Sequence, residues 1–238
     1  MFEMEDRHFW FVSRRNLLVE LIKSLNILDP KILDIGAGTG GNIAVLEKFG
    51  EVRGIEPSER AIEFCQERGL KNIERGSIEN LNFRDRTFDI VTCLDVLEHV
   101  SSPAIGLREL KRVLKDEGKI IITVPAFRSL WSRHDEALNH LRRYDKKDLI
   151  GDLEAAGLRV ETIGYFFFLS YFVIAPARIL GRFFARRSGP KSDTLILPPK
   201  PLNGLLKLWF YLEAKIAVRF GLPFGTTIYA IASRSGAS

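Results

Sequence analysis

The stretch ILDIGAGTGGN, Ile32–Asn42, decides the fold of this chain. An apolar run leads directly into a glycine-rich turn, which is the order of residues found where a strand ends and a helix begins. Gly36 has no Cβ and permits a tight turn, and Gly38 lets a ligand lie against the backbone. The first amides of the following helix are free donors. The stretch therefore predicts a ligand site at the end of a strand.

The glycine spacing alone leaves the class of ligand open. Gly36, Gly38 and Gly41 satisfy the GxGxxG pattern of dinucleotide enzymes, and Gly36, Gly38 and Gly40 satisfy a GxGxG pattern. Glu56 lies 20 residues beyond Gly36, just after the next predicted strand. A carboxylate there can accept hydrogen bonds from both ribose hydroxyls. These residues indicate an adenosine-containing ligand, and NAD would use them in the same way.

Strand-like and helix-like segments alternate around this turn. An apolar stripe predicts an amphipathic helix over Arg14–Leu25. The next predicted strands are Lys31–Ile35, Val52–Ile55, Asn72–Arg75, Phe88–Cys93 and Lys119–Val124. The helices predicted between them are Gly41–Phe49, Glu59–Arg68 and Ala104–Leu114. This alternation is typical of an α/β fold with a doubly wound parallel sheet, and the β-branched run Ile120–Val124 suits a strand covered on both faces.

The second half of the chain departs from this simple alternation. A helix over Lys146–Ala156 and strands over Leu158–Gly164 and Thr226–Ser233 are predicted there. The residues between these two strands contain the aromatic stretch Tyr165–Phe184 and the amphipathic stretch Leu205–Phe220, which we interpret as a helical insertion. We expect one domain made of a cap helix (1–28), a cofactor-binding core (29–163), a substrate-facing or membrane-facing lid (164–225) and a final strand (226–238).

Composition narrows the setting in which the protein works. The 35 basic and 30 acidic side chains give a net charge of only +5, too weak by itself to imply nucleic acid. The two cysteines have no metal-like spacing and no signal peptide is visible, so we expect a reduced, cytoplasmic protein. The apolar run Ile163–Ala177 is too short to span a bilayer, which needs roughly 20 residues.

Two clusters of basic residues bear on the partners of the protein. The clusters are Arg178, Arg182, Arg186, Arg187 and Lys191, and Arg142, Arg143, Lys146 and Lys147. Runs of this kind are usually solvated surface, and the alternatives are an anionic substrate or an anionic membrane surface. With the neighbouring aromatic stretch, they leave peripheral contact with the inner face of a membrane as an open alternative.

Four motifs in order identify a family resemblance. They are ILDIGAGTG, VRGIEPSERAIEFC, RGSIENLNFRDRTFDIVTCLDVLEHV and LRELKRVLKDEGKIIITVP, which together cover about Lys31–Pro125. In these motifs the chain resembles the class I S-adenosylmethionine-dependent methyltransferases, particularly the small-molecule group that includes quinone-biosynthesis enzymes. The resemblance implies a Rossmann-like fold with a mostly parallel seven-stranded sheet, and S-adenosylmethionine as the cofactor.

The resemblance also implies which residues bind the cofactor. The acid that matches Asp34 helps, in this family, to set the glycine-rich loop and the methionine end of the cofactor. The residues that match Gly36, Ala37 and Gly38 lie under the cofactor. Glu56 matches the acid that binds the ribose in this family. The residues that match the adenine site and the methionine site are Ser77, Ile78, Leu94 and Asp95. Ser77 stands where the family usually has Asp, so a hydroxyl replaces the carboxylate that usually contacts the adenine amino group. The N-terminal HFWF…RR element, also similar to a family subgroup, adds Trp10 to cover the cofactor and Arg14 to pair with its carboxylate.

Histidines are the candidate catalytic residues. His99 follows the fourth predicted strand, at the edge where such sheets bind ligands, and a pKa near neutrality suits proton removal. His134 and His140 follow the fifth strand and are candidates for contact with the methyl acceptor. Glu98 beside His99 does not make a convincing metal pair, because adjacent residues do not face one way on a helix and we expect no third ligand nearby. We therefore expect no metal.

Three other functions stay open from the residues. An NAD-dependent oxidoreductase would use the same turn and acid, and a non-catalytic module could keep the fold. A nucleic-acid methyltransferase is less consistent, because Leu94–Leu97 replaces the Asn/Asp-Pro-Pro-aromatic motif of amino-directed enzymes. We expect direct displacement of the methyl group by a small or lipid-like acceptor, such as a quinone precursor or a membrane-carried glycan intermediate.

Overall fold

Seven strands form a single sheet in the part of the chain that the computed structural model describes, residues 2–184 and 197–236. Their order is β3-β2-β1-β4-β5-β7-β6. The strands are β1 (Lys31–Ile35), β2 (Glu51–Glu56), β3 (Ile73–Arg75), β4 (Phe88–Leu94), β5 (Leu114–Pro125), β6 (Leu158–Phe166) and β7 (Thr227–Arg234). β7 runs antiparallel to its neighbours β5 and β6, and the other pairs are parallel. The predicted mostly parallel, seven-stranded sheet is confirmed.

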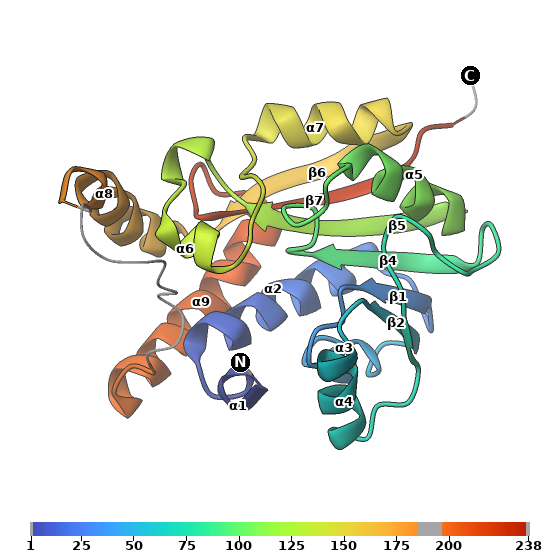
Figure 1. Cartoon of the computed structure of the whole chain (residues 1–238), viewed down its shortest axis with the longest axis horizontal. Helices are drawn as coiled ribbons and strands as arrows, with labels where there is room; N and C mark the ends of the chain where they lie inside the picture. Colours follow the sequence, from blue (N-terminus) through green and yellow to red (C-terminus); the bar gives the residue numbers. More distant parts are fainter. Residues whose placement is uncertain (1, 185–196, 237–238) are drawn as a thin grey trace.

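Helices cover both faces of this sheet (Figure 1). The α-helices are α1 (Phe2–Glu5), α2 (Phe9–Leu25), α3 (Ile43–Leu46), α4 (Glu59–Glu67), α5 (Pro103–Val113), α6 (Arg133–Ala137), α7 (Lys146–Ala155), α8 (Phe168–Phe184) and α9 (Lys200–Phe220), and η1 (Arg128–Leu130) is a short 3-10 helix. α5 and α7 lie on one face, and α2 and α9 lie side by side on the other (Figure 1).

The apolar core has one cluster on each face of the sheet. Ile120 and Ile122 pack in the cluster that contains the buried leucines of α5 and α7. Ile121, between them, packs in the cluster that contains Leu21 of α2 and Phe210 of α9. Successive side chains of a strand point to opposite faces, so the β-branched run fills both layers at once. This confirms that the strand is covered on both faces.

Outside the insertion, most predicted boundaries agree with the structure to within two residues, and three segments differ. Within the insertion, α8 begins at Phe168, three residues after the predicted start, and α9 begins at Lys200, five residues before it. α2 begins at Phe9, five residues before the predicted start, because His8 caps it there. The helix predicted over Gly41–Phe49 is limited to α3, because the residues on either side of it form bends and turns. The strand β5 begins at Leu114, before the predicted start at Lys119, and pairs there with β4. None of these differences moves the turn that follows β1.

The predicted insertion contains the two helices α8 and α9. Tyr165 and Phe166 belong to β6, where they pair with β7, so the insertion begins after them. Among the described residues, no helix has the length and apolar character needed to cross a membrane. Three members of the first basic cluster, Arg186, Arg187 and Lys191, fall outside the described residues. The division of the chain into cap, core and lid stays a prediction.

Candidate functional site

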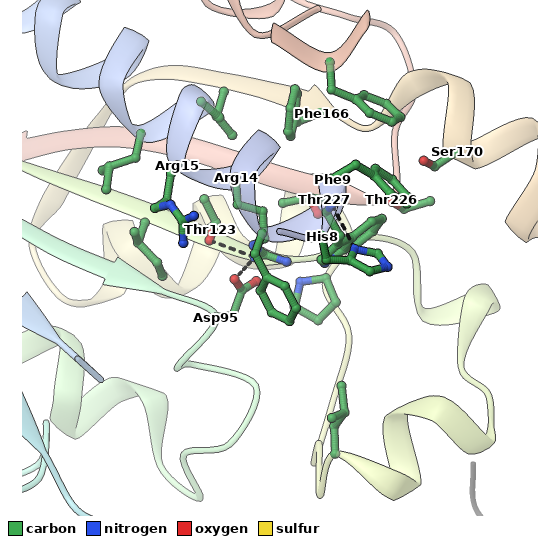
Figure 2. A pocket seen from close by; sticks show the side chains of 18 of the residues that line it. His8, Phe9, Arg14, Arg15, Asp95, Thr123, Phe166, Ser170, Thr226 and Thr227 are labelled. Atoms are coloured by element: carbon green, nitrogen blue, oxygen red, sulfur yellow. Dashed lines mark hydrogen bonds and ion pairs between the residues drawn. The ribbon is translucent and has the colours of Figure 1, made fainter. Parts of the chain in front are cut away.

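A cavity of about 730 Å³ lies at the carboxyl ends of β1, β4 and β5. Its walls come from the glycine turn, from the loops after β4 and β5, and from helices α2, α8 and α9. Figure 2 shows α2 crossing this space, with Arg14 pointing toward the end of β4. Most of the residues predicted to bind the cofactor or to act in catalysis meet here. Those that line the cavity are Trp10, Arg14, Gly36, Ala37, Gly38, Leu94, Asp95, His99 and His140.

The glycine turn has the geometry that a nucleotide cofactor needs. Gly36 and Gly38 both have positive φ, +74° and +56°, a region that costs other residues energy. A Cβ on Gly36 would come within 2.5 Å of a Val96 methyl carbon, so the turn also requires glycine for space. A Cβ on Gly38 would meet no described atom nearer than 4.0 Å. Gly38 therefore faces open space in the cavity, where a ligand can approach the backbone.

Glu56 ties the glycine turn to the end of β2. Its Oε2 accepts a hydrogen bond from the Gly38 amide at 2.8 Å, and its Oε1 accepts one from the Ser58 amide at 2.9 Å. The side chain is almost fully buried. Each carboxylate oxygen has two lone pairs, so both can accept a second bond from a ribose hydroxyl. Glu56 holds the turn, a role that the sequence did not reveal. It is not among the residues that line the cavity, so its contact with a ribose stays a prediction.

Asp34 lies beneath the turn, fully buried in β1. Its Oδ1 accepts a hydrogen bond from the Thr92 hydroxyl at 2.6 Å, and its Oδ2 has no hydrogen-bond partner among the described residues. Burial raises the pKa of Asp34 to about 7, and the nearby Glu56 charge raises it as well. Asp34 does not line the cavity, so an effect on the cofactor would pass through the loop above it.

Arg14 and Asp95 form an ion pair inside the cavity (Figure 2). Asp95 follows β4 with a φ of +55°, and its amide donates to the Thr123 carbonyl at 2.9 Å. The Arg14 guanidinium, which we expected to pair with the cofactor carboxylate, pairs here with Asp95 and reaches the Thr123 hydroxyl at 3.5 Å. The pairing with the cofactor stays a prediction.

The start of α2 brings an aromatic wall to the cavity. The Trp10 ring stacks on Phe167, with 3.9 Å between centroids and 2° between planes. His8 caps the helix, because its Nδ1 accepts a hydrogen bond from the Trp10 amide at 3.1 Å. Trp10 is thus held in one orientation against the insertion, and it lines the cavity where we expected it to cover the cofactor.

Ser77 and Ile78, the residues predicted near the adenine, lie outside the cavity. Ile78 is buried in the core, where its side chain packs against Gly106 of α5. Ser77 is exposed, and its hydroxyl accepts a hydrogen bond from the Glu79 amide at 3.3 Å. Their contact with an adenine ring stays a prediction, since the side chain of Ile78 already has a core partner.

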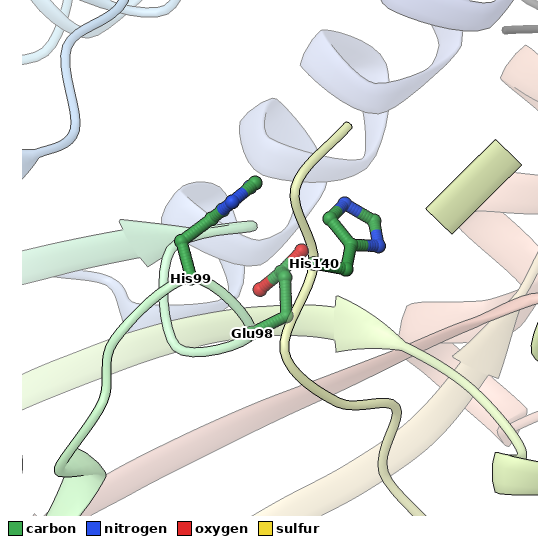
Figure 3. A group of neighbouring side chains, drawn as sticks. All are labelled: Glu98, His99 and His140. Carbon is green, nitrogen blue, oxygen red and sulfur yellow. The ribbon is translucent and has the colours of Figure 1, made fainter. Parts of the chain in front are cut away.

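Glu98, His99 and His140 come together on the β4 side of the cavity (Figure 3). Their potential ligand atoms all lie within 4.8 Å of one another, and the two imidazole rings meet edge to face at 4.8 Å between centroids. Burial raises the pKa of Glu98 to about 7. Burial also lowers the pKa of His99, and the neighbouring His140 lowers it further. The argument that no third ligand stands near Glu98 and His99 is therefore wrong: folding supplies His140 from a segment 41 residues further on.

Asp135 orients His140 from behind. The carboxylate is fully buried, and its Oδ1 lies 2.9 Å from His140 Nδ1 and 2.7 Å from Arg143 Nε. Burial alone would raise the pKa of Asp135, but the bond from His140 and the charges of Arg143 and Arg178 hold it well below its ordinary value. An ionised carboxylate can only accept, so His140 Nδ1 carries the proton and Nε2 is the nitrogen left for other contacts.

Sequence reasoning did not identify Asp135, and it treated Arg143 as part of a surface cluster. Arg143 is buried, and it donates to Asp135 and, at 2.7 Å, to the Ala126 carbonyl. The one local signal was the spacing of Ser132 and Asp135, which form a capping box at the start of α6. His134 also lines the cavity, as expected for a residue near the acceptor.

Comparison with known proteins gives a consistent family. A family model described as a methyltransferase domain matches residues 33–122. The putative methyltransferase YrhH of Bacillus subtilis is 31% identical over 131 residues, which is 49% of this chain and 73% of the relative. Demethylmenaquinone methyltransferase of Thermotoga maritima is 35% identical over 113 residues, 45% of this chain. The match spans 48% of that relative, so the chain aligns with about half of its length.

Solved structures agree with the fold. The crystal structure of a S-adenosylmethionine-dependent methyltransferase of Thermotoga maritima, described as a possible histamine N-methyltransferase, aligns with a TM-score of 0.60. The alignment covers 95% of this chain and 93% of that one, at 21% identity. Identity at this level shows that the two share an architecture, and it carries no information on the acceptor.

Proposed function

Because the chain belongs to the class I S-adenosylmethionine-dependent methyltransferases, we propose that it transfers a methyl group from this cofactor to a small apolar or lipid-linked acceptor. The observation that carries the proposal is one cavity with two chemically different parts. The turn at Gly36–Gly38 forms one part, and the buried cluster of Glu98, His99 and His140 forms another. The family membership argues against an NAD-dependent oxidoreductase.

The residues of the cavity divide the work of a displacement reaction. The bound cofactor supplies a methyl group on a cationic sulfur that becomes a neutral thioether, so its reactivity is intrinsic. Gly38 and Glu56 would bind the nucleoside, and Trp10 on α2 would exclude water. His99 and His140 lie where a nucleophilic group of the acceptor would be held, and a proton must leave this group if it is a hydroxyl or an ammonium.

The insertion suggests where the acceptor comes from. One side of α9 carries six large apolar residues at intervals of three or four, which are exposed: Leu202, Leu205, Trp209, Leu212, Ile216 and Phe220. We call these six residues the α9 stripe. Side chains at this spacing share one face of a helix, and a contiguous exposed apolar face indicates an interaction surface.

The charges beside the α9 stripe favour an anionic membrane as its partner. Lys200, Lys207, Lys215 and Arg219 lie on the same helix. Its one acidic residue, Glu213, is buried and accepts a hydrogen bond from the Phe168 amide at 2.8 Å. A helix with an apolar face, cations and no exposed acid is typical of a segment that lies in the membrane interface.

The residues of the α9 stripe do not line the cavity, but other apolar residues of α8 and α9 do. Leu169 and Val173 of α8 are exposed, and both also line the cavity together with Leu206 of α9. A hydrophobic acceptor held in a bilayer could therefore enter between α8 and α9 without crossing water. Quinones and lipid-carried glycan intermediates are acceptors of this kind, and a quinone precursor is the acceptor of one named relative.

Cofactor binding tests the first half of the proposal. Calorimetry and thermal unfolding of the full chain with S-adenosylhomocysteine should show binding, and ligand at 100 times its Kd stabilises by about 2.7 kcal/mol. For a domain of this size, this corresponds to a rise in Tm of roughly 5–11 °C. The same concentration of NAD should give no shift. A shift with NAD and none with S-adenosylhomocysteine would overturn the assignment.

Vesicle flotation tests the second half. The full chain should float with vesicles that contain anionic lipid and much less with neutral vesicles. The triple variant Leu212→Ser, Ile216→Ser, Phe220→Ser should stay in the dense fraction. The matched control is Leu28→Ser, which removes a side chain that is 93% exposed on the loop between α2 and β1. Equal flotation of both variants would refute membrane contact through α9.

A further inference from the structure

Glu98 presents a buried carboxylate oxygen that the described part of the chain does not satisfy. The residue is 1% exposed, and its Oε2 has no hydrogen-bond partner there. Burying a polar atom without a partner costs free energy, so an orphan of this kind calls for an explanation. Glu98 lines the cavity, and its neighbours there are the rings of His99 and His140 (Figure 3).

One of the two imidazoles, that of His140, is oriented by a hydrogen bond on one ring nitrogen. His140 Nδ1 bonds to Asp135, as described above. The backbone of Asn139 lies close enough to His99 to raise the pKa of this imidazole. Histidines that bind metal ions almost always donate their second ring N–H to a carboxylate or a backbone carbonyl, which fixes the tautomer and the direction of the free nitrogen. His140 has such a contact with the carboxylate of Asp135.

The charges around the cluster, within the described residues, leave Glu98 without a dedicated counter-ion. Arg14 faces it from α2 but is paired with Asp95. Arg143 faces it from the loop after β5 but is paired with Asp135. His140 also acts on this carboxylate, and the charge of Glu98 in turn raises the pKa of Cys93 and of Tyr144. A cation held between Glu98 and the two imidazoles would therefore meet a negative ligand and two neutral ones.

We propose that Glu98, His99 and His140 bind one divalent transition-metal ion of the Zn²⁺ class. This inference rests on the proposed function, because it assigns a task to the acceptor side of the same cavity. Two imidazoles and one carboxylate are a recurring ligand set of catalytic Zn²⁺ and non-haem Fe²⁺ sites, which keep positions open for water or substrate. The cluster opens on the cavity, so an oxygen of the acceptor can take the open position.

The ion changes what the two histidines do. As ligands, they do not remove the proton of the acceptor themselves. The ion lowers the pKa of a bound hydroxyl as it does that of bound water, and the released proton passes to water. The acceptor is then an oxygen nucleophile, a phenol or an alcohol, rather than a carbon or an amine. Asp135 acts as a positioning residue, through His140.

Metal binding by the full chain tests this inference directly. Protein treated with a chelator and then dialysed against Co²⁺ should bind about one ion per chain and develop the visible absorption of a Co²⁺ site with few ligands. Zn²⁺ should displace the Co²⁺ and abolish the absorption. Mg²⁺, which prefers oxygen ligands, should not compete. Competition by Mg²⁺ as strong as that by Zn²⁺ would overturn the assignment of a site built on imidazole.

Variants locate the ion. His99→Ala, His140→Ala and Glu98→Gln should each lose the Co²⁺ absorption, whereas the control His134→Ala, from the same cavity, should keep it. Asp135→Asn should weaken binding by roughly 10–100-fold, the usual effect of removing an outer-sphere partner. Thermal unfolding and calorimetry with S-adenosylhomocysteine check that each variant is folded.

The outcomes separate this inference from the proposed function. Absence of Co²⁺ binding by protein that binds S-adenosylhomocysteine would overturn the metal site alone, and the histidines would return as candidate bases. Metal binding that survives all three ligand substitutions would overturn it as well. Failure to bind S-adenosylhomocysteine, with the metal site intact, would instead refute the proposed function.

Discussion

Glu56→Gln is the substitution that tests the cofactor site most sharply, because the carboxylate has two structural bonds and two predicted ligand bonds. Its oxygens accept from the Gly38 amide and the Ser58 amide at 2.8 and 2.9 Å. Glutamine keeps one acceptor oxygen, so one of the two amides loses its partner. An unsatisfied buried donor costs about 1–3 kcal/mol, which lowers the Tm of a domain of this size by roughly 2–12 °C.

The effect on cofactor affinity is larger than this loss of stability explains. A hydrogen bond from a ribose hydroxyl to a charged acceptor contributes about 1.5–3 kcal/mol, and each 1.4 kcal/mol is a factor of ten. We therefore expect S-adenosylhomocysteine to bind roughly 10–150-fold more weakly, as measured by calorimetry below the Tm of the variant. The matched control is Glu59→Gln on α4, whose exposed pair with Arg75 is worth little.

Two results would refute this reasoning. If Glu56→Gln and Glu59→Gln bind S-adenosylhomocysteine equally well, Glu56 does not bind the ribose. If the Tm of Glu56→Gln falls while its affinity stays at the wild-type value, the acid only anchors the turn. Both measurements use the same preparations, so a variant that fails to fold is recognised by its unfolding curve.

Three further substitutions follow from the contacts. Gly38→Ala should cost about 1–2 kcal/mol of stability, because φ is positive, and calorimetry should show an added loss of cofactor affinity, because the Cβ enters open cavity space. Asp34→Asn should flatten the pH profile of stability. The pKa of Asp34 is about 7 in the folded protein against an ordinary value of 3.8, so this residue makes the free energy of unfolding fall as the pH rises from about 4 to 7. Denaturant titrations at these two pH values measure the slope. Asn203→Ala removes an acceptor 2.9 Å from the Phe9 amide, so hydrogen exchange at the start of α2 should accelerate while exchange in β4 stays unchanged.

The fold was predictable because its signals are local. The apolar run before Gly36 defines β1 to the residue, and Gly157 ends α7 within one residue of the predicted position. The predicted ends of an element were wrong where hydrogen bonds to a strand distant in the sequence determine them. Tyr165 and Phe166 read as part of an aromatic helical stretch, but hydrogen bonding to β7 keeps them in β6. Intrinsic preference is a weak prior at such positions, and tertiary contacts override it.

The site was predictable on one side only. The residues of the cofactor side, Gly36 to Glu56, stand close together in the sequence and match the family motifs that confirm the resemblance. The acceptor side depends on residues from separate segments, and their distances along the sequence do not indicate that they meet. Glu98 and His140 are neighbours because the Leu141 amide donates to the Glu98 carbonyl at 2.7 Å and because Asp135 bonds to His140 from behind. The charge pairs of Asp135 also come from separate segments. A motif cannot show such a partnership.

The topology of the sheet explains why the wall of the cavity that α8 and α9 form comes from the second half of the chain. β7 is antiparallel to β5 and to β6, so β6 runs in the same direction as β5 and ends, at Phe166, at the carboxyl edge of the sheet. β7 begins at that same edge, with Thr227 paired to both Pro125 and Phe166. Any segment between these two strands must start and finish over the cavity. The sequence of α8 and α9 can therefore vary without changing the strands that carry the glycine turn, because those strands have their connections elsewhere.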